Sequence, residues 1–213
     1  MTTSTTAPSR FSLRVPPDWV QFDIQRATRT GELTRIVDEH LAGLPHLRPL
    51  RRDILRALRH LATEAESAGA VLCAAAVDDQ GEDGALLATL VTFITDGMPE
   101  PALNTIPAIA AQLTATPRTE PAADGTEPDW REVRVIEIPA GDAVQLRGLT
   151  TIEADGEGPS LRLVTMETLI PLPGGERILN LVLTSPHVTV VDDLLEVFGL
   201  ISETLTWDEV SLT

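Results

Sequence analysis

Four arginines at positions 48, 52, 56 and 59 are the residues best placed to do chemistry. Their spacing of three or four residues puts Arg48, Arg52, Arg56 and Arg59 along one side of a helix that turns about 100° per residue. A guanidinium group can hold a carboxylate through two parallel hydrogen bonds, so such a row suits an acidic segment or a carboxylate ligand. A second interpretation stays open, in which the row is an exposed face that forms ion pairs with acids of the same molecule.

The distribution of charge makes this arginine row stand out. The chain has a formal net charge of −16, all of its basic residues are arginine, and residues 1–59 hold ten arginines against six acids. Residues 60–213 hold six arginines against 26 acids. A strongly negative chain is a poor match for nucleic acid or for an anionic membrane, because both attract positive surfaces. The acids Asp192, Glu196 and Glu203 have the same two interpretations as the arginines, a binding face or a solvated one.

No pattern typical of a catalytic, metal or cofactor site occurs elsewhere. The sequence has no phosphate loop, dinucleotide fingerprint, zinc spacing or nucleophile elbow. The turn at 78–83 is acidic but lacks the Asp-x-Asp-x-Asp-Gly alternation of a calcium loop. Cys73 lies within the apolar run AVLCAAAV and is predicted to be a buried thiol. The four histidines are scattered, at positions 40, 46, 60 and 187. We therefore expect no catalytic residue, no metal site and no cofactor.

The first half of the chain predicts strands followed by helices and a hairpin. In FSLRV (11–15) apolar and polar residues alternate, as in a half-buried strand, and Pro16 and Pro17 end that strand. Trp19 is then expected to fold back over the edge of the sheet. The apolar spacing changes to a helical period from Gly31 to Gly69 and back to strand-like runs after it. The further expected elements are a strand at 20–24, helices at 30–44 and 47–69, and a hairpin of strands at 70–77 and 85–94.

The second half predicts a helix capped by Asn104, then four strands and a final helix. The turn PLPGGE is a strong hairpin signal, and Thr189 to Asp192 has the pattern of a capping box that opens the last helix. The strands are expected at 131–139, 143–154, 161–172 and 176–185. The predicted fold class is α+β, with one antiparallel twisted sheet of about six to eight strands packed between helices and the C-terminal helix docked on the sheet. The predicted domain plan is a flexible tail at 1–9, a single domain at 10–208 with a helical segment at 31–69 and a mobile acidic loop at 114–129, and a tail at 209–213.

The two ends of the chain resemble the Mog/PsbP-like α/β sandwich superfamily. At the start, FSLRVPPDW is similar to the strand and turn that open such domains. At the end, a strand is followed by a helix whose apolar pair, Phe, Ile and Ser precede a terminal Trp, here Leu194, Leu195, Phe198, Ile201, Ser202 and Trp207. The resemblance implies an antiparallel sheet between helical layers that serves as a non-enzymatic binding module. It implies no functional residue, and the segments 31–69 and 114–129 depart from it.

These observations lead to one main functional hypothesis and two others. The main hypothesis is a non-enzymatic, cytoplasmic protein-interaction module, such as an adaptor, a chaperone or an immunity-type protein, with an unidentified protein partner and no membrane insertion. The alternative is a small-ligand-binding protein or modest enzyme with a pocket between sheet and helices, where Arg134, Arg147 or Arg162 presents a guanidinium to a carboxylate. The third is a homodimer formed through an edge strand.

Overall fold

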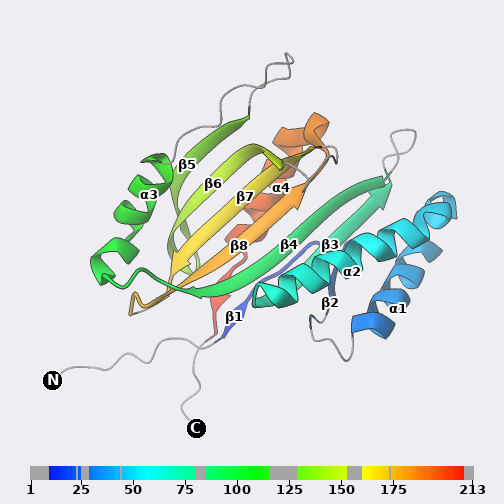
Figure 1. Cartoon of the computed structure of the whole chain (residues 1–213), viewed down its shortest axis with the longest axis horizontal. Coiled ribbons are helices and arrows are strands. Elements are labelled where there is room, and N and C mark those ends of the chain that lie inside the picture. The colour runs from blue at the N-terminus through cyan, green and yellow to red at the C-terminus, as the bar shows by residue number, and fades with distance from the viewer. Residues whose placement is uncertain are drawn as a thin grey trace, which may run out of the picture. The chain divides into compact units, whose positions relative to one another are not determined.

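A computed structural model describes residues 10–22, 24, 29–43, 45–79, 85–115, 129–152, 160–172 and 174–208 (Figure 1). The two predicted tails and residues 116–128 of the predicted acidic loop lie outside the described residues. The predicted fold class is confirmed, because seven antiparallel strands follow the order β2-β3-β4-β8-β7-β6-β5 and helices pack on them. The chain divides into two compact units, Pro16–Phe93 and a second unit made of Met1–Val15 with Ile94–Thr213.

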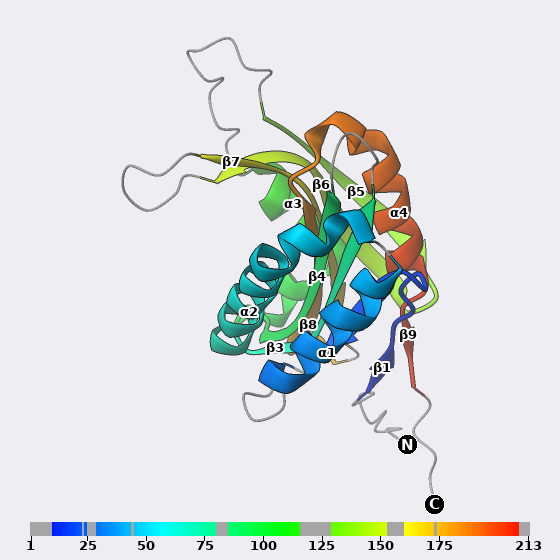
Figure 2. The same cartoon turned by 90° about the vertical axis from the view of Figure 1, so that its right-hand side faces the viewer.

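The unit Pro16–Phe93 contains two helices packed on three strands. Its elements are β2 (Trp19–Phe22), α1 (Arg29–Ala42), the 3₁₀ turn η1 (Pro45–Leu50), α2 (Arg51–Ser67), β3 (Ala70–Asp79) and most of β4 (Ala85–Asp96). The helices lie side by side, with α1 against β2 and α2 against β3 (Figure 2). The long helix begins later than predicted, at Arg51. Pro49 lacks a backbone N–H and disfavours an α-helical turn, so the residues before Arg51 form a 3₁₀ turn.

Helical spacing of apolar residues explains how this unit packs. In α2 the buried residues recur every three or four positions and face the strands; they are Leu55, Leu58, Ala62 and Ala65. In β3 Ala74, Ala75 and Ala76 are all at most 3% exposed, so both faces of this strand are covered, as predicted for a central strand.

The second unit contains a four-strand meander with a helix on either side. Its main elements are η3 (Pro101–Asn104), α3 (Ile106–Ala115), β5 (Trp130–Ile138), β6 (Gly141–Ile152), β7 (Leu161–Pro171), β8 (Arg177–Ser185), η4 (Val188–Val190) and α4 (Val191–Glu203). The register pairs Thr168 with Leu181, and this face of β7 and β8 is covered by α4, whose Phe198 is completely buried. Figure 2 shows α3 on the opposite side of these strands, where it contacts β5 and β6. The predicted docking of the last helix on the sheet is confirmed.

The first strand differs from the prediction. Only Phe11–Ser12 form β1, and β1 pairs with β9 (Thr206–Trp207) in a separate two-stranded sheet. The prediction that residues 11–15 belong to the main sheet is therefore wrong. The reason is that the Thr204 hydroxyl group accepts a hydrogen bond from the Arg14 N–H at 2.9 Å, and its single proton is shared between the carbonyl oxygens of Arg14 and Ile201, at 2.9 and 2.7 Å. These bonds satisfy the Arg14 backbone without a neighbouring strand.

Both predicted helix caps are wrong as well. Asn104 is 3% exposed and holds the turn after β4, since its side chain bonds the N–H and carbonyl of Met98 and the carbonyl of Gly175 at 2.7–2.9 Å. At the last helix, residues 188–190 form a 3₁₀ turn, and the N-cap residue Val190 makes no side-chain cap bond. The 3₁₀ turn places Val190 at the N-cap position, and because valine has no polar side-chain atom no capping box forms.

Candidate functional site

The four predicted arginines lie on η1 and on the first half of α2. Arg48 is in η1, and Arg52, Arg56 and Arg59 follow one another at intervals of four and three residues in α2, with all four side chains exposed. Residues at these intervals are neighbours on a helix surface. The buried stripe that begins at Leu55 faces the strands, so the arginines line a solvent-exposed side of the helix. We refer to Arg48, Arg52, Arg56 and Arg59 as the arginine stripe.

The acids of the same molecule engage little of the arginine stripe. Arg56 Nη1 lies 2.8 Å from Asp53 Oδ1, but these side chains are 78% and 65% exposed, and such pairs contribute at most about 1 kcal/mol. Arg59 donates a long hydrogen bond of 3.4 Å to the Thr34 hydroxyl group of α1. Within the described ranges of the chain, Arg48 and Arg52 form no hydrogen bond or ion pair. Among the described residues, Arg56 is thus the member of the stripe for which the structure gives an ion pair.

Two acids of α1, Asp38 and Glu39, are bound to arginines outside the stripe. Arg51 forms a bidentate pair with Asp38, with Nε–Oδ1 and Nη2–Oδ2 distances of 2.5 and 2.9 Å. The hydrogen bond from Arg51 lowers the pKa of Asp38, and the same bond raises the pKa of Arg51. Arg35 binds Glu39 at 2.7 Å in the same helix. Sequence reasoning missed the Arg51–Asp38 pair, because these residues lie on different helices and no periodic pattern connects them.

The stripe therefore forms a positive surface on a negative chain. Residues 45–60 contain five arginines and one acid, although the whole chain carries −16. An exposed guanidinium without a fixed partner can bind a carboxylate in the planar, two-point geometry that lysine cannot provide. The guanidinium groups of this surface can bind carboxylates, and the exposed imidazole of His60 lies one helical turn after Arg56.

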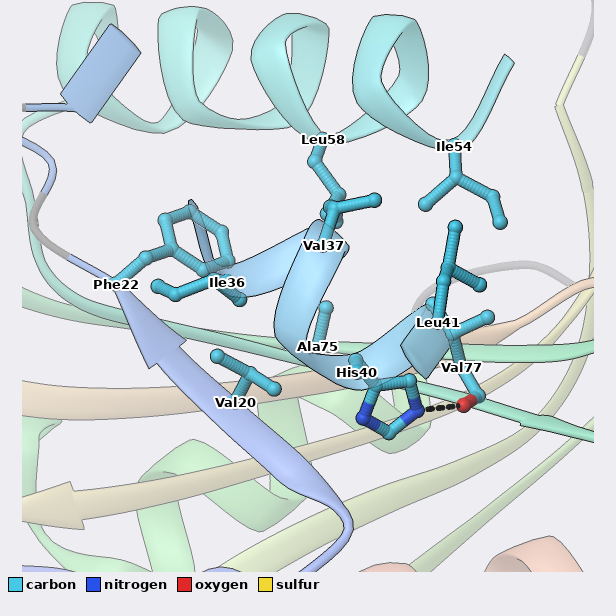
Figure 3. A pocket seen from close by; sticks show the side chains of 10 residues that line it. All are labelled: Val20, Phe22, Ile36, Val37, His40, Leu41, Ile54, Leu58, Ala75 and Val77. Atoms are coloured by element: carbon cyan, nitrogen blue, oxygen red, sulfur yellow. Dashed lines mark hydrogen bonds between the residues drawn. The ribbon is translucent and has the colours of Figure 1, made fainter. Parts of the chain in front are cut away.

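An apolar pocket lies beneath α1, at the junction of α1, α2, β2 and β3 (Figure 3). Its volume of about 20 Å³ admits roughly one water molecule. The lining residues are Val20, Phe22, Ile36, Val37, His40, Leu41, Ile54, Leu58, Ala75 and Val77, of which only His40 is polar. With nine apolar residues and this volume, the pocket is a gap in the packing and not a preformed site for a small molecule.

His40 has a structural hydrogen bond in this pocket. Its Nε2 atom bonds the Val77 carbonyl oxygen, as Figure 3 shows. Val77 is one residue beyond Ala76, which is the last β3 residue with a partner in β2. A carbonyl oxygen only accepts, so Nε2 carries the proton. The bond ties α1 to the part of β3 that extends past β2.

The strand arginines of the alternative hypothesis are bound to acids of their own unit. Arg134 Nε and Arg147 Nη2 each lie 2.8 Å from an oxygen of Glu132. The hydrogen bonds from Arg134 and then Arg147 lower the pKa of Glu132. Arg162 Nε lies 3.4 Å from Asp129 Oδ1. None of these arginines lines the pocket of Figure 3, so the structure does not bring the predicted guanidinium and the pocket together.

One perturbed acid was missed from the sequence. Glu167 of β7 is half-buried on the sheet face opposite α4, with Leu146 and Val182 as its cross-strand neighbours. Desolvation raises the pKa of Glu167, and the charge of Arg131 opposes part of that rise. The signal in the sequence was an acid in the strand VTMETLI, on the face opposite the buried residues.

The other candidate residues do not converge. His60 is exposed, His187 is half-buried, the side chain of His46 lies outside the description, and Asp192, Glu196 and Glu203 are exposed on α4. In the parts of the chain that the structure describes, no three His, Cys, Asp or Glu side chains are close enough to hold a metal ion. Cys73 is buried as predicted, and burial raises the pKa of its thiol to about 12.

Comparison with known proteins finds similarity to solved structures. No family model and no curated protein matches the chain. A solved structure of LpqN from Mycobacterium tuberculosis, described as involved in cell envelope biogenesis, is similar with a TM-score of 0.43 and 13% sequence identity, over 95% of this chain and 86% of that one. A similarity of this degree carries no argument about function, and the Mog/PsbP-like resemblance stays a prediction. None of the helices within the described residues has the length and apolar character that crossing a membrane requires.

Proposed function

We propose that this protein is a non-enzymatic, cytoplasmic interaction module that binds an acidic segment of a protein partner through the arginine stripe. The observation that supports this proposal is the exposure of Arg48, Arg52, Arg56 and Arg59, among which the described part of the chain gives one weak ion pair, on a chain whose net charge is −16. Elsewhere the chain repels an acidic segment, so the stripe also sets where such a segment binds.

The size of the expected effect follows from the exposure of the stripe. Each exposed arginine–carboxylate contact contributes about 0.2–1 kcal/mol, and reversing a charge replaces an attraction by a repulsion of similar size. Reversing two charges should therefore weaken binding by about 0.8–4 kcal/mol, or roughly 4- to 900-fold in Kd. The fold should tolerate the change, since exposed substitutions usually alter the free energy of unfolding by less than about 0.5 kcal/mol.

A fluorescein-labelled glutamate-rich peptide is the probe for this proposal. Its binding to the full chain is measured by fluorescence anisotropy at low and moderate salt, for the native sequence and for Arg52→Glu with Arg56→Glu. The matched control is Arg10→Glu with Arg177→Glu, which changes the net charge equally at two exposed arginines outside the stripe. Circular dichroism confirms that each variant is folded.

The two variants should separate clearly. We expect the stripe variant to lose at least about fourfold in affinity and the control to bind within about twofold of the native chain. Equal losses of affinity in the stripe variant and the control would show that peptide binding depends on the net charge of the chain and not on the arginine stripe. Failure of the native chain to bind the peptide at low salt would remove the proposal.

A further inference from the structure

The strand β5 leaves one long edge of the sheet without a strand neighbour. It stands last in the strand order and is hydrogen-bonded to β6 along one side, from Trp130↔Leu149 to Ile138↔Gly141. Within the described residues no other backbone group bonds β5. The helix α3 contacts β6 as well as β5 and therefore lies over the face of these strands rather than along the outer edge. A nine-residue edge of this kind is a template for a further strand.

A second copy of β5 fits this edge in one register better than in the others. A two-fold axis perpendicular to the sheet pairs β5 with β5 of the second copy in the antiparallel direction. Each face of one sheet then continues into the same face of the other, so even-numbered residues lie opposite even-numbered residues and odd-numbered residues lie opposite odd-numbered ones. With the axis at Val133, Val133 faces its own copy and Trp130 faces Ile136. In the same register Glu132, which also binds Arg134 and Arg147 of its own chain, faces Arg134 of the second copy twice, once on each side of the axis. Opposite charges and aromatic–β-branched pairs each contribute about 0.2–1 kcal/mol across strands.

The neighbouring registers are less favourable. An axis at Glu132 sets that acid against its own copy, and an axis at Arg134 sets that arginine against its own copy. Within β5, an axis at Val135 places three charged residues, Glu132, Arg134 and Glu137, opposite apolar ones, whereas the axis at Val133 does so only for Arg131, which faces Val135. Like charges directly opposite one another destabilise a strand pair.

We propose that the chain forms a two-fold symmetric dimer through antiparallel pairing of β5 with β5 of a second copy, with the axis at Val133. The exposure of Val135, which is 59% exposed, and of Arg134 agrees with an edge that is open to this partner. The dimer joins two second units edge to edge, and the arginine stripe, which belongs to the unit Pro16–Phe93, takes no part in the pairing.

Charge-swapped variants test the register. Glu132→Arg sets two arginines opposite one another in the homodimer, and Arg134→Glu sets two acids opposite one another. A mixture of the two variants restores opposite charges at all four positions. Sedimentation of the full chain should show that each variant alone dissociates at least about tenfold more readily than the native dimer, and that the mixture forms a heterodimer. Circular dichroism of each variant alone checks its fold.

Single cysteines provide a second test that does not depend on charge. In a Cys73→Ala background, Val133→Cys places two thiols opposite one another, whereas Val135→Cys on the same face places them about 13 Å apart along the strands. Oxidation should link Val133→Cys into a dimer faster than Val135→Cys, although position 135 is the more exposed in the monomer. A monomeric native chain, equal or faster linkage at position 135, or a charge-swapped mixture that stays monomeric would each overturn the proposal.

Discussion

Replacing Ala75 by valine should raise the free energy of unfolding by about 1 kcal/mol. Ala75 is 3% exposed and lines the apolar pocket beneath α1, whose volume is about 20 Å³. Valine adds two carbon atoms, and burial of each stabilises by about 0.8 kcal/mol. Fixing the larger side chain costs about 0.5 kcal/mol in rotamer entropy. The difference leaves a gain of about 1 kcal/mol, or a rise in Tm of about 2–4 °C for a chain of this length.

Urea unfolding followed by helical circular dichroism measures this gain as a rise in the midpoint with an unchanged m value. The matched control is Ala74→Val, the same change one residue earlier, where the side chain is 0% exposed and does not line the pocket. There we expect a loss of about 1–3 kcal/mol from overpacking. A loss of stability in Ala75→Val comparable with that of Ala74→Val would refute the description of the pocket as an unfilled packing gap.

Three further predictions concern other buried groups. Ser202→Ala should lower the free energy of unfolding by about 1–3 kcal/mol, because the buried Thr168 hydroxyl group, 3.2 Å from Ser202 Oγ, loses its acceptor. The double variant Thr168→Val with Ser202→Ala should recover part of that loss, as measured by urea unfolding. No recovery in the double variant would contradict the explanation. Burial raises the pKa of Glu167 above its ordinary value of 4.5, so the folded chain binds this proton more tightly than the unfolded chain does. The resulting stabilisation of the folded chain is complete below pH 4.5 and is lost as the pH rises through the folded pKa. Glu167→Gln should flatten that part of the pH–stability curve, and identical curves for the variant and the native chain would be the contrary result. The Cys73 thiol, with its pKa raised to about 12, should react with a disulfide reagent only when the chain unfolds, whereas rapid labelling under native conditions would contradict its burial.

Local patterns were enough to predict most helices and strands of the fold. The helical spacing of Leu58 and Ala65 marks the buried side of α2, although the other buried residues there are Leu55 and Ala62 and not Ile54 and Leu61. The apolar run around Cys73 marks a strand covered on both faces. The same periodicity placed the arginine stripe on an exposed side of a helix, because charged residues in a helix occupy the side that the apolar residues leave open.

The features that sequence reasoning missed depend on contacts between distant residues. The Thr204 hydroxyl group bonds the Arg14 backbone across 190 positions, which shortens β1. Asn104 bonds the Gly175 carbonyl across 71 positions, so its side chain is not available as a helix cap. The Arg51–Asp38 pair likewise joins two helices. Periodicity carries no information about such bonds, since each depends on how separate elements meet in the folded chain.

Site-specific photo-crosslinking on α2 tests the binding role of the arginine stripe most directly. A photo-reactive amino acid at Thr63, four residues after Arg59 and on the same exposed side of the helix, leaves all four arginines in place. The control is the same group at Ala57, which is also exposed but lies about 100–160° around the helix. In cells of the native host, the proposed function predicts one major protein adduct at position 63, with linked peptides rich in Asp and Glu, and little or none at position 57. Equal adducts at both positions, or no adduct at position 63, would contradict it.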